Sequence, residues 1–73
     1  MTIKEKFLVR SDVYSLPVVV ISNNPVQMWH YKSLLYMMND KSAFDICNLK
    51  YKTSSVQKDI DGEDSFMIIF TED

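Results

Sequence analysis

Apolar and polar residues alternate along residues 3–10, and this period of two predicts a strand. One face of that strand is mainly apolar, and the other carries the basic side chains of Lys4, Lys6 and Arg10. The β-branched run Val18–Ile21 predicts a second strand that is apolar on both faces.

Helix-start signals follow in Asn24, Pro25 and Gln27. Asn24 suits an N-cap, Pro25 suits the first helical position, and Gln27 is placed to complete a capping box. They predict a helix from Pro25 to about Asn39 or Asp40. On such a helix the wider apolar stripe, which we expect to cover the sheet, holds Met28, Tyr31, Leu34, Leu35 and Met38.

Two further strands are expected after this helix. Ala43–Thr53 reads as a strand whose apolar phase changes near Cys47, which predicts a bulge there. Asp61-Gly62 predicts a type I′ hairpin leading into a last strand, Ser65–Thr71. A two-residue turn at this point pairs Val56 with Met67 and Thr53 with Phe70.

The expected fold is therefore α+β, a single small domain over residues 1–73 in the order β-β-α-β-β. One helix packs on one face of a four-stranded, mostly antiparallel sheet. The last strand separates Phe66, Ile68 and Phe70 from Met67 and Ile69, and the helix covers only one of these faces. The other face is either exposed or covered from outside the chain, and we assign Met67 and Ile69 to it as partner-binding residues.

Composition narrows the function classes. The chain has one cysteine and one histidine, which excludes an internal disulfide and a Cys/His metal cluster. Its single glycine, Gly62, leaves no phosphate-binding loop. The segment Asp59–Asp64 resembles a fragment of a calcium loop but lacks its closing glutamate, so we interpret it as a hairpin tip. We expect no catalytic residues, no metal and no cofactor, and hence not an enzyme.

Charge is unevenly distributed, although the net charge is only −2. Eight basic and four acidic residues give residues 1–58 a charge of +4, and six acidic residues give residues 59–73 a charge of −6. Such a dipole is typical of solvated segments or of a surface that orients a partner. No apolar run is long enough to span a bilayer or to form a signal core, so we expect no membrane association and a cytoplasmic location.

The favoured binding site is a second stripe of the predicted helix, formed by Trp29 and Tyr36 with Lys32 beside them. Tryptophan and tyrosine are enriched at interface hot spots, which favours a protein partner. The excess of apolar faces leaves open whether that partner is another protein or a second copy in a homodimer. The alternative is packing of this stripe under the loop 11–17.

A second hypothesis is a small protein that binds RNA or single-stranded DNA. It uses the basic residues of two predicted strands if these strands are neighbours: Lys4, Lys6, Arg10, Lys50 and Lys52. The sequence pI of about 5.2 and the lack of an aromatic stacking signature weigh against it.

In general character the chain resembles the small accessory proteins of large phages, being tiny, poor in glycine and without motifs. That resemblance implies an inhibitor or modulator of a larger host protein and assigns no residue roles. We therefore expect a non-catalytic protein-binding module.

Overall fold

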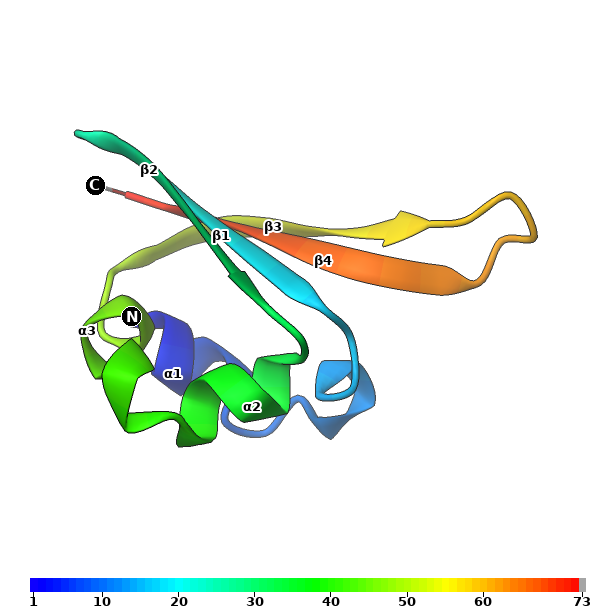
Figure 1. Cartoon of the computed structure of the whole chain (residues 1–73), viewed down its shortest axis with the longest axis horizontal. Helices are drawn as coiled ribbons and strands as arrows, with labels where there is room; N and C mark the ends of the chain where they lie inside the picture. Colours follow the sequence, from blue (N-terminus) through cyan, green and yellow to red (C-terminus); the bar gives the residue numbers. More distant parts are fainter. Residues whose placement is uncertain (73) are drawn as a thin grey trace.

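A computed structural model of the chain, which describes residues 1–72, has one four-stranded sheet with all its helices on a single face (Figure 1). This arrangement confirms the predicted α+β class with a mostly antiparallel sheet. The strands are β1 (Val18–Asn23), β2 (Val26–Tyr31), β3 (Tyr51–Lys58) and β4 (Asp64–Thr71). The helices are α1 (Ile3–Phe7), α2 (Leu34–Asn39) and α3 (Phe44–Cys47), with 3-10 turns η1 (Ser11–Val13) and η2 (Lys41–Ala43).

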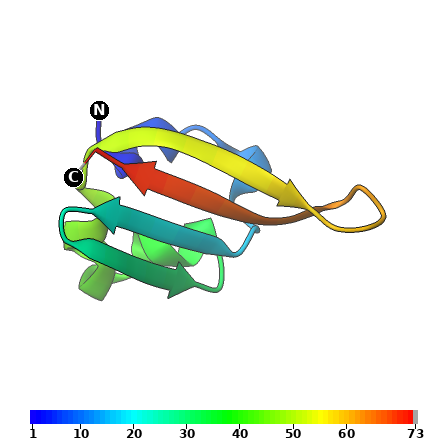
Figure 2. The ribbon, with the colours of Figure 1, turned by 90° about the horizontal axis from the view of Figure 1, so that it is seen from above.

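The sheet joins two antiparallel hairpins through one parallel pair. Its strand order is β2-β1-β4-β3, and β1 runs parallel to β4. Figure 2 shows β2 and β3 as the two outer strands and the β3–β4 hairpin extending beyond the helical layer. The inner strands β1 and β4 are the ones with apolar residues on both faces, as expected for strands flanked on both sides.

The core lies between the sheet and the short helices. Val18 and Val20 of β1 lie beside Met67 and Ile69 of β4 in the parallel register, and all four side chains are buried. The helices complete the core with the buried side chains of Ile3, Phe7, Leu34, Met37, Ala43 and Cys47. The helices thus cover the central part of one face of the sheet, and the end of the β3–β4 hairpin extends beyond them.

The predicted strand at residues 3–10 is wrong, because residues 3–7 form α1. The Thr2 side chain accepts a hydrogen bond from the Glu5 backbone, and the Glu5 carboxylate accepts one from the Thr2 backbone. This capping box starts the helix. The hydrogen bond from the Thr2 backbone is the main cause that lowers the pKa of Glu5, and the bond with the Thr2 side chain adds to it. Ile3 and Phe7, four residues apart, are buried on the same side of the helix.

The predicted helix from Pro25 is also wrong over most of its first half. Asn24 and Pro25 form the turn of a hairpin, and β2 pairs with β1 without interruption from Asn23↔Val26 to Val18↔Tyr31. The helix α2 begins only at Leu34, after Ser33, whose hydroxyl accepts a hydrogen bond from the Tyr36 backbone at 3.0 Å. Asparagine and proline are common both in turns and at helix starts. Pairing with β1, which is rich in β-branched residues, favours the turn here.

The first part of the predicted strand Ala43–Thr53 is helical instead, over residues 43–47, and only residues 51–53 belong to a strand. The Asp40 carboxylate caps this segment by accepting from the Ser42 backbone at 3.0 Å. Ala43 and Cys47 are both buried, which is the spacing of a helical turn and removes the need for the predicted bulge at Cys47. The strand β3 starts at Tyr51, and its register shift lies between Tyr51 and Thr53.

The β3–β4 hairpin confirms the predicted register, with Val56 opposite Met67 and Thr53 opposite Phe70. The turn is not type I′, because among the described residues only Gly62 has a positive φ, of 81°. Asp59 closes the turn by accepting hydrogen bonds at its carboxylate from the backbones of Asp61 and Glu63. A second register shift follows at Gln57/Lys58.

Candidate protein-binding surface

The face of the sheet opposite the helices is covered by nothing in the described chain. Because side chains alternate along a strand, the residues next to the buried ones point away from the helices. The pairing registers place twelve of them together, and we call this set the open face. Its members are Val19, Ile21, Asn23, Val26, Met28, His30, Thr53, Ser55, Gln57, Phe66, Ile68 and Phe70.

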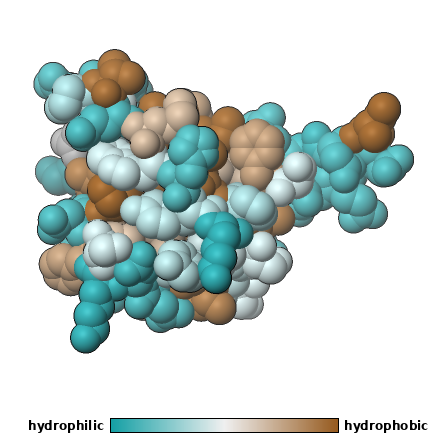
Figure 3. Space-filling view, in the orientation of Figure 1, coloured by the Kyte–Doolittle hydropathy of each residue, from teal (hydrophilic) through white to brown (hydrophobic). Residues whose placement is uncertain are grey.

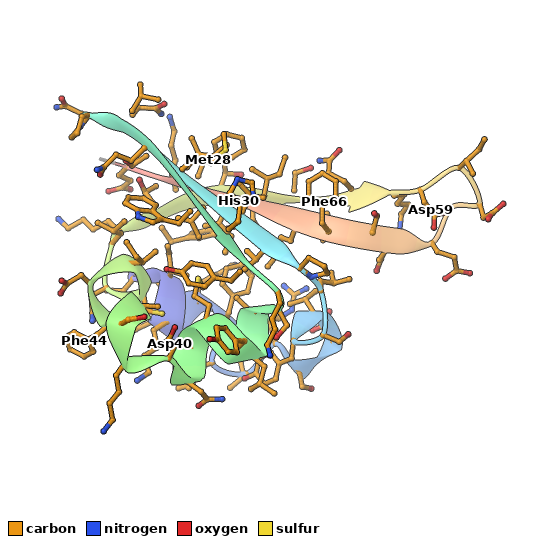
Figure 4. The ribbon with its side chains drawn as sticks, in the orientation of Figure 1. Met28, His30, Asp40, Phe44, Asp59 and Phe66 are labelled. Atoms are coloured by element: carbon orange, nitrogen blue, oxygen red, sulfur yellow. The ribbon has the colours of Figure 1, made fainter. Side chains whose placement is uncertain are left out.

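Two rows of side chains cross the open face. In the first row, His30, Val19, Ile68 and Ser55 are cross-strand neighbours in that order. In the second row, Met28, Ile21, Phe70 and Thr53 follow one another in the same way. Figure 4 shows the labelled side chains of Met28, His30 and Phe66 on this side of the sheet, away from the helices.

The twelve residues of the open face include no Asp, Glu, Lys or Arg, although 25% of the chain's residues are of these types. The charged residues Lys52 and Asp64 stand at the margins of the face, where the pairing of β3 with β4 shifts. Figure 3 shows hydrophobic side chains interspersed with hydrophilic ones along this upper side of the molecule. A solvent-exposed sheet face usually carries charged residues, which favour hydration and disfavour association with other sheets. Apolar side chains hold seven of the twelve positions. The other five are polar residues other than Asp, Glu, Lys and Arg, namely Asn23, His30, Thr53, Ser55 and Gln57. The face is therefore suited to contact with an apolar surface.

Its apolar part is the size of a small binding patch. Four strands about 4.8 Å apart and about six residues long span roughly 19 by 20 Å, or about 400 Å². The seven apolar of the twelve positions hold about 230 Å² of this area, somewhat below the roughly 300–600 Å² of the largest apolar patches of typical monomers. Met28 is 57% exposed and Val26 is 79% exposed, whereas Ile21, Ile68 and Phe70 cover one another and are half-buried.

Met67 and Ile69, predicted to bind a partner, belong to the core instead. They are 1% and 0% exposed and lie beside the buried Val18 and Val20. The predicted division of the last strand into two faces is correct, but the helices cover the face of Met67 and Ile69. Phe66, Ile68 and Phe70 therefore take their place on the exposed side.

Trp29, Lys32 and Tyr36 do not form the predicted single helical stripe. Trp29 lies on β2, half-buried against the core on the helix side of the sheet. Tyr36 lies on α2 with 45% of its surface exposed, and the Lys32 ammonium lies 4.5 Å from the centre of its ring. Lys32 and Tyr36 are thus close together, beside a shallow groove lined by Ser33, Leu35, Tyr36, Asn39, Asp40 and Lys41, while Trp29 belongs to a different element.

The basic segments of the nucleic-acid hypothesis are adjacent, although the first is a helix. Thr2 bridges to Lys50, and the Lys6 ammonium lies 5.3 Å from the centre of the Tyr51 ring. Tyr51 is half-buried in a T-shaped contact with Phe7, and the Lys6 ammonium lies over one face of its ring, which leaves little of the ring for base stacking. Arg10 is paired with Asp12 at 3.0 Å. Lys4, Lys6, Lys50 and Lys52 remain as a modest basic cluster without a stacking platform.

The remaining reactive side chains lie apart from one another. Cys47 is 3% exposed under the sheet, and burial raises the pKa of its thiol. His30 lies on the open face, so the sheet separates the two. Asp59 is occupied by the hairpin turn, and no group of three potential metal ligands occurs within residues 1–72.

Comparison with known proteins identifies no relative: no family model, no curated protein and no solved structure matches the chain. Of the helices in residues 1–72, none is long and apolar enough to cross a membrane. The functional interpretation therefore depends on the geometry of the chain itself.

Proposed function

We propose that the chain is a non-catalytic protein-binding module that holds a partner protein on its open face and modulates that partner by binding. The observation that carries this proposal is the uncharged, mainly apolar open face of a sheet whose other face is already covered by helices. Sheets with both faces apolar are normally covered on both sides, by helices or by a second sheet.

The chemistry of the face specifies the chemistry of the partner. A charge on the partner would lose water on contact and find no opposite charge on the open face, which is unfavourable. An amphipathic helix offers a neutral apolar stripe, and its diameter of about 10–12 Å fits within the roughly 19 Å width of the sheet. We therefore name an amphipathic helix of another protein, lying along the strands, as the occupant.

Complete burial of the face yields a limited affinity. The seven apolar of the twelve positions hold about 230 Å² of the face, which at about 25 cal/mol per Å² gives roughly 6 kcal/mol on this side of the contact. Association costs an estimated 4–15 kcal/mol in lost translational and rotational freedom, so a large share of this gain is cancelled. A reversible complex is expected, which suits an inhibitor or modulator.

The test compares two serines that are both exposed but lie on different sides of the molecule. Ser55→Lys places a charge on the open face, and Ser15→Lys places the same charge in the loop before β1. The immobilised wild-type chain captures proteins from extracts of its source cells, and each captured protein is identified, purified and titrated by calorimetry. The partner should bind wild type and Ser15→Lys equally, and Ser55→Lys roughly tenfold more weakly.

Equal binding of the two variants would exclude the open face as the site. A wild-type chain that stays monomeric and captures no protein that binds after purification would contradict the proposed function itself.

A further inference from the structure

The two edges of the sheet are built differently. The edge strand β3 has lysines at Lys52 and Lys58 and register shifts at Tyr51/Thr53 and Gln57/Lys58. Charged side chains and irregular pairing are the devices by which natural edge strands avoid pairing with other chains. The β3 edge is therefore protected.

The edge strand β2 has none of these devices. Its six residues pair with β1 in one unbroken register, and none of them is Asp, Glu, Lys or Arg. Within residues 1–72, the backbone of β2 makes no hydrogen bond beyond its pairing with β1. Because antiparallel pairing uses alternate residues, about half of its N–H and C=O groups point outward without a partner.

Apolar exposure is also concentrated at this edge. Val26 and Met28 of β2 are 79% and 57% exposed, whereas Val19 and Ile21 of the neighbouring strand are half-buried. An added strand beside β2 would cover these side chains and satisfy the outward backbone groups together.

We propose that β2 pairs in antiparallel fashion with β2 of a second copy, forming a homodimer with one continuous eight-stranded sheet. Two-fold pairing places the central residue of β2 opposite its own copy, so a charge near the axis would meet a like charge. The absence of Asp, Glu, Lys and Arg along β2 is consistent with a second copy of the chain as the partner. The net charge of −2 per chain causes only weak repulsion between the two copies.

Only a few registers are compatible with this dimer. A two-fold axis perpendicular to the sheet keeps both helical layers on one side, so paired residues must belong to the same face. The axis then passes either between two copies of Met28, with Val26 opposite His30, or between two copies of Trp29, with Gln27 opposite Tyr31. In both registers the two open faces join into one surface of twice the width.

This inference uses the edge of the sheet and goes beyond the proposed function, which uses its open face. The dimer proposal and the proposed function can therefore fail independently. Substitutions at two glutamines distinguish pairing through the edge from association through the open face. Gln27 lies on β2 with its side chain on the helix side, and Gln57 lies on β3 within the open face.

The experiment measures the dissociation constant of the dimer by sedimentation velocity over a range of micromolar concentrations. Wild type and Gln57→Lys should form a dimer of equal affinity, and Gln27→Lys should dissociate about tenfold more readily or more. Gln27 is exposed, so the variant should keep the wild-type circular dichroism spectrum and melting curve.

Amide hydrogen exchange of the wild type provides a readout that needs no variant. Exchange in residues 26–31 should slow as the concentration rises, while exchange in residues 51–58 stays constant. Weakening by Gln57→Lys instead of Gln27→Lys would overturn the proposal in favour of face-to-face pairing. A wild type that remains monomeric throughout would overturn it as well.

Discussion

Two neighbouring isoleucines on β4 allow the assignment of the sheet faces to be measured. Ile69 is 0% exposed beside Val20 in the core, and Ile68 is half-buried on the open face. Replacing each with alanine removes the same three carbon atoms at adjacent positions of one strand. The comparison therefore isolates the difference between the covered and the open face.

The expected costs follow from burial. At about 0.8 kcal/mol for each buried carbon, Ile69→Ala loses about 2.4 kcal/mol of transfer free energy. The residual cavity adds about 1 kcal/mol, for a total of about 3–4 kcal/mol. Part of the Ile68 side chain is already in contact with water and its loss leaves no enclosed cavity, so Ile68→Ala should cost only about 1.5 kcal/mol.

Urea unfolding followed by circular dichroism gives both free energies. A domain of this size has about 4–11 kcal/mol of stability, of which Ile69→Ala should leave about 0–8 kcal/mol. Its Tm should fall by about 12–30 °C, against about 6–12 °C for Ile68→Ala. Equal losses at the two positions, independent of protein concentration, would refute the assignment of Ile68 to an uncovered face.

Three other predictions concern single local features. Gly62→Ala should cost about 1 kcal/mol in urea unfolding, because φ at this position is 81°; Gly62→Asn should lose less, and an equal loss would argue against backbone strain. Thr2→Ala should cost about 1 kcal/mol in a thermal melt, whereas Thr2→Ser should preserve stability; a neutral Thr2→Ala would show that the capping box does not hold α1. Burial raises the pKa of the Cys47 thiol above its ordinary 9.0, so the unfolded chain releases this proton first as the pH rises. The stability that the neutral thiol contributes is therefore present below pH 9.0 and is lost as the pH rises through the pKa of the folded state. Over this pH range, the free energy of unfolding of the wild type should approach that of Cys47→Ala. A constant difference between the two proteins would contradict this linkage.

Sequence reasoning succeeded where the information was local. The Asp61-Gly62 turn is predicted at the right place, and the expected cross-strand neighbours of Met67 and Phe70 are observed. The turn itself is longer than two residues, and the register shift at Gln57/Lys58 restores the expected pairing. The β-branched run Val18–Ile21 likewise predicted a central strand. The Thr2–Glu5 capping box is an equally local signal that favours a helix, and the alternating pattern of residues 3–10 obscured it.

The errors arose where distant pairing decided the outcome. Residues 26–31 satisfy helical and strand spacing equally, and pairing with β1 selected the strand. This choice also moved Trp29 away from Tyr36 and changed the expected binding site. The faces of β4 were separated correctly, but only the parallel pairing with β1 shows that Met67 and Ile69 point toward the helices.

The parallel pair of β1 and β4 also has consequences for how the chain folds. Each hairpin closes over a short turn, whereas β1 and β4 are separated by 40 residues along the chain. Closing so long a loop loses conformational entropy before its contacts form, and such pairings slow folding. The hairpins should therefore form first, and their joining should limit the rate. Substitutions at Val20 and Ile69, which meet at this junction, are expected to slow refolding more than substitutions at the ends of either hairpin.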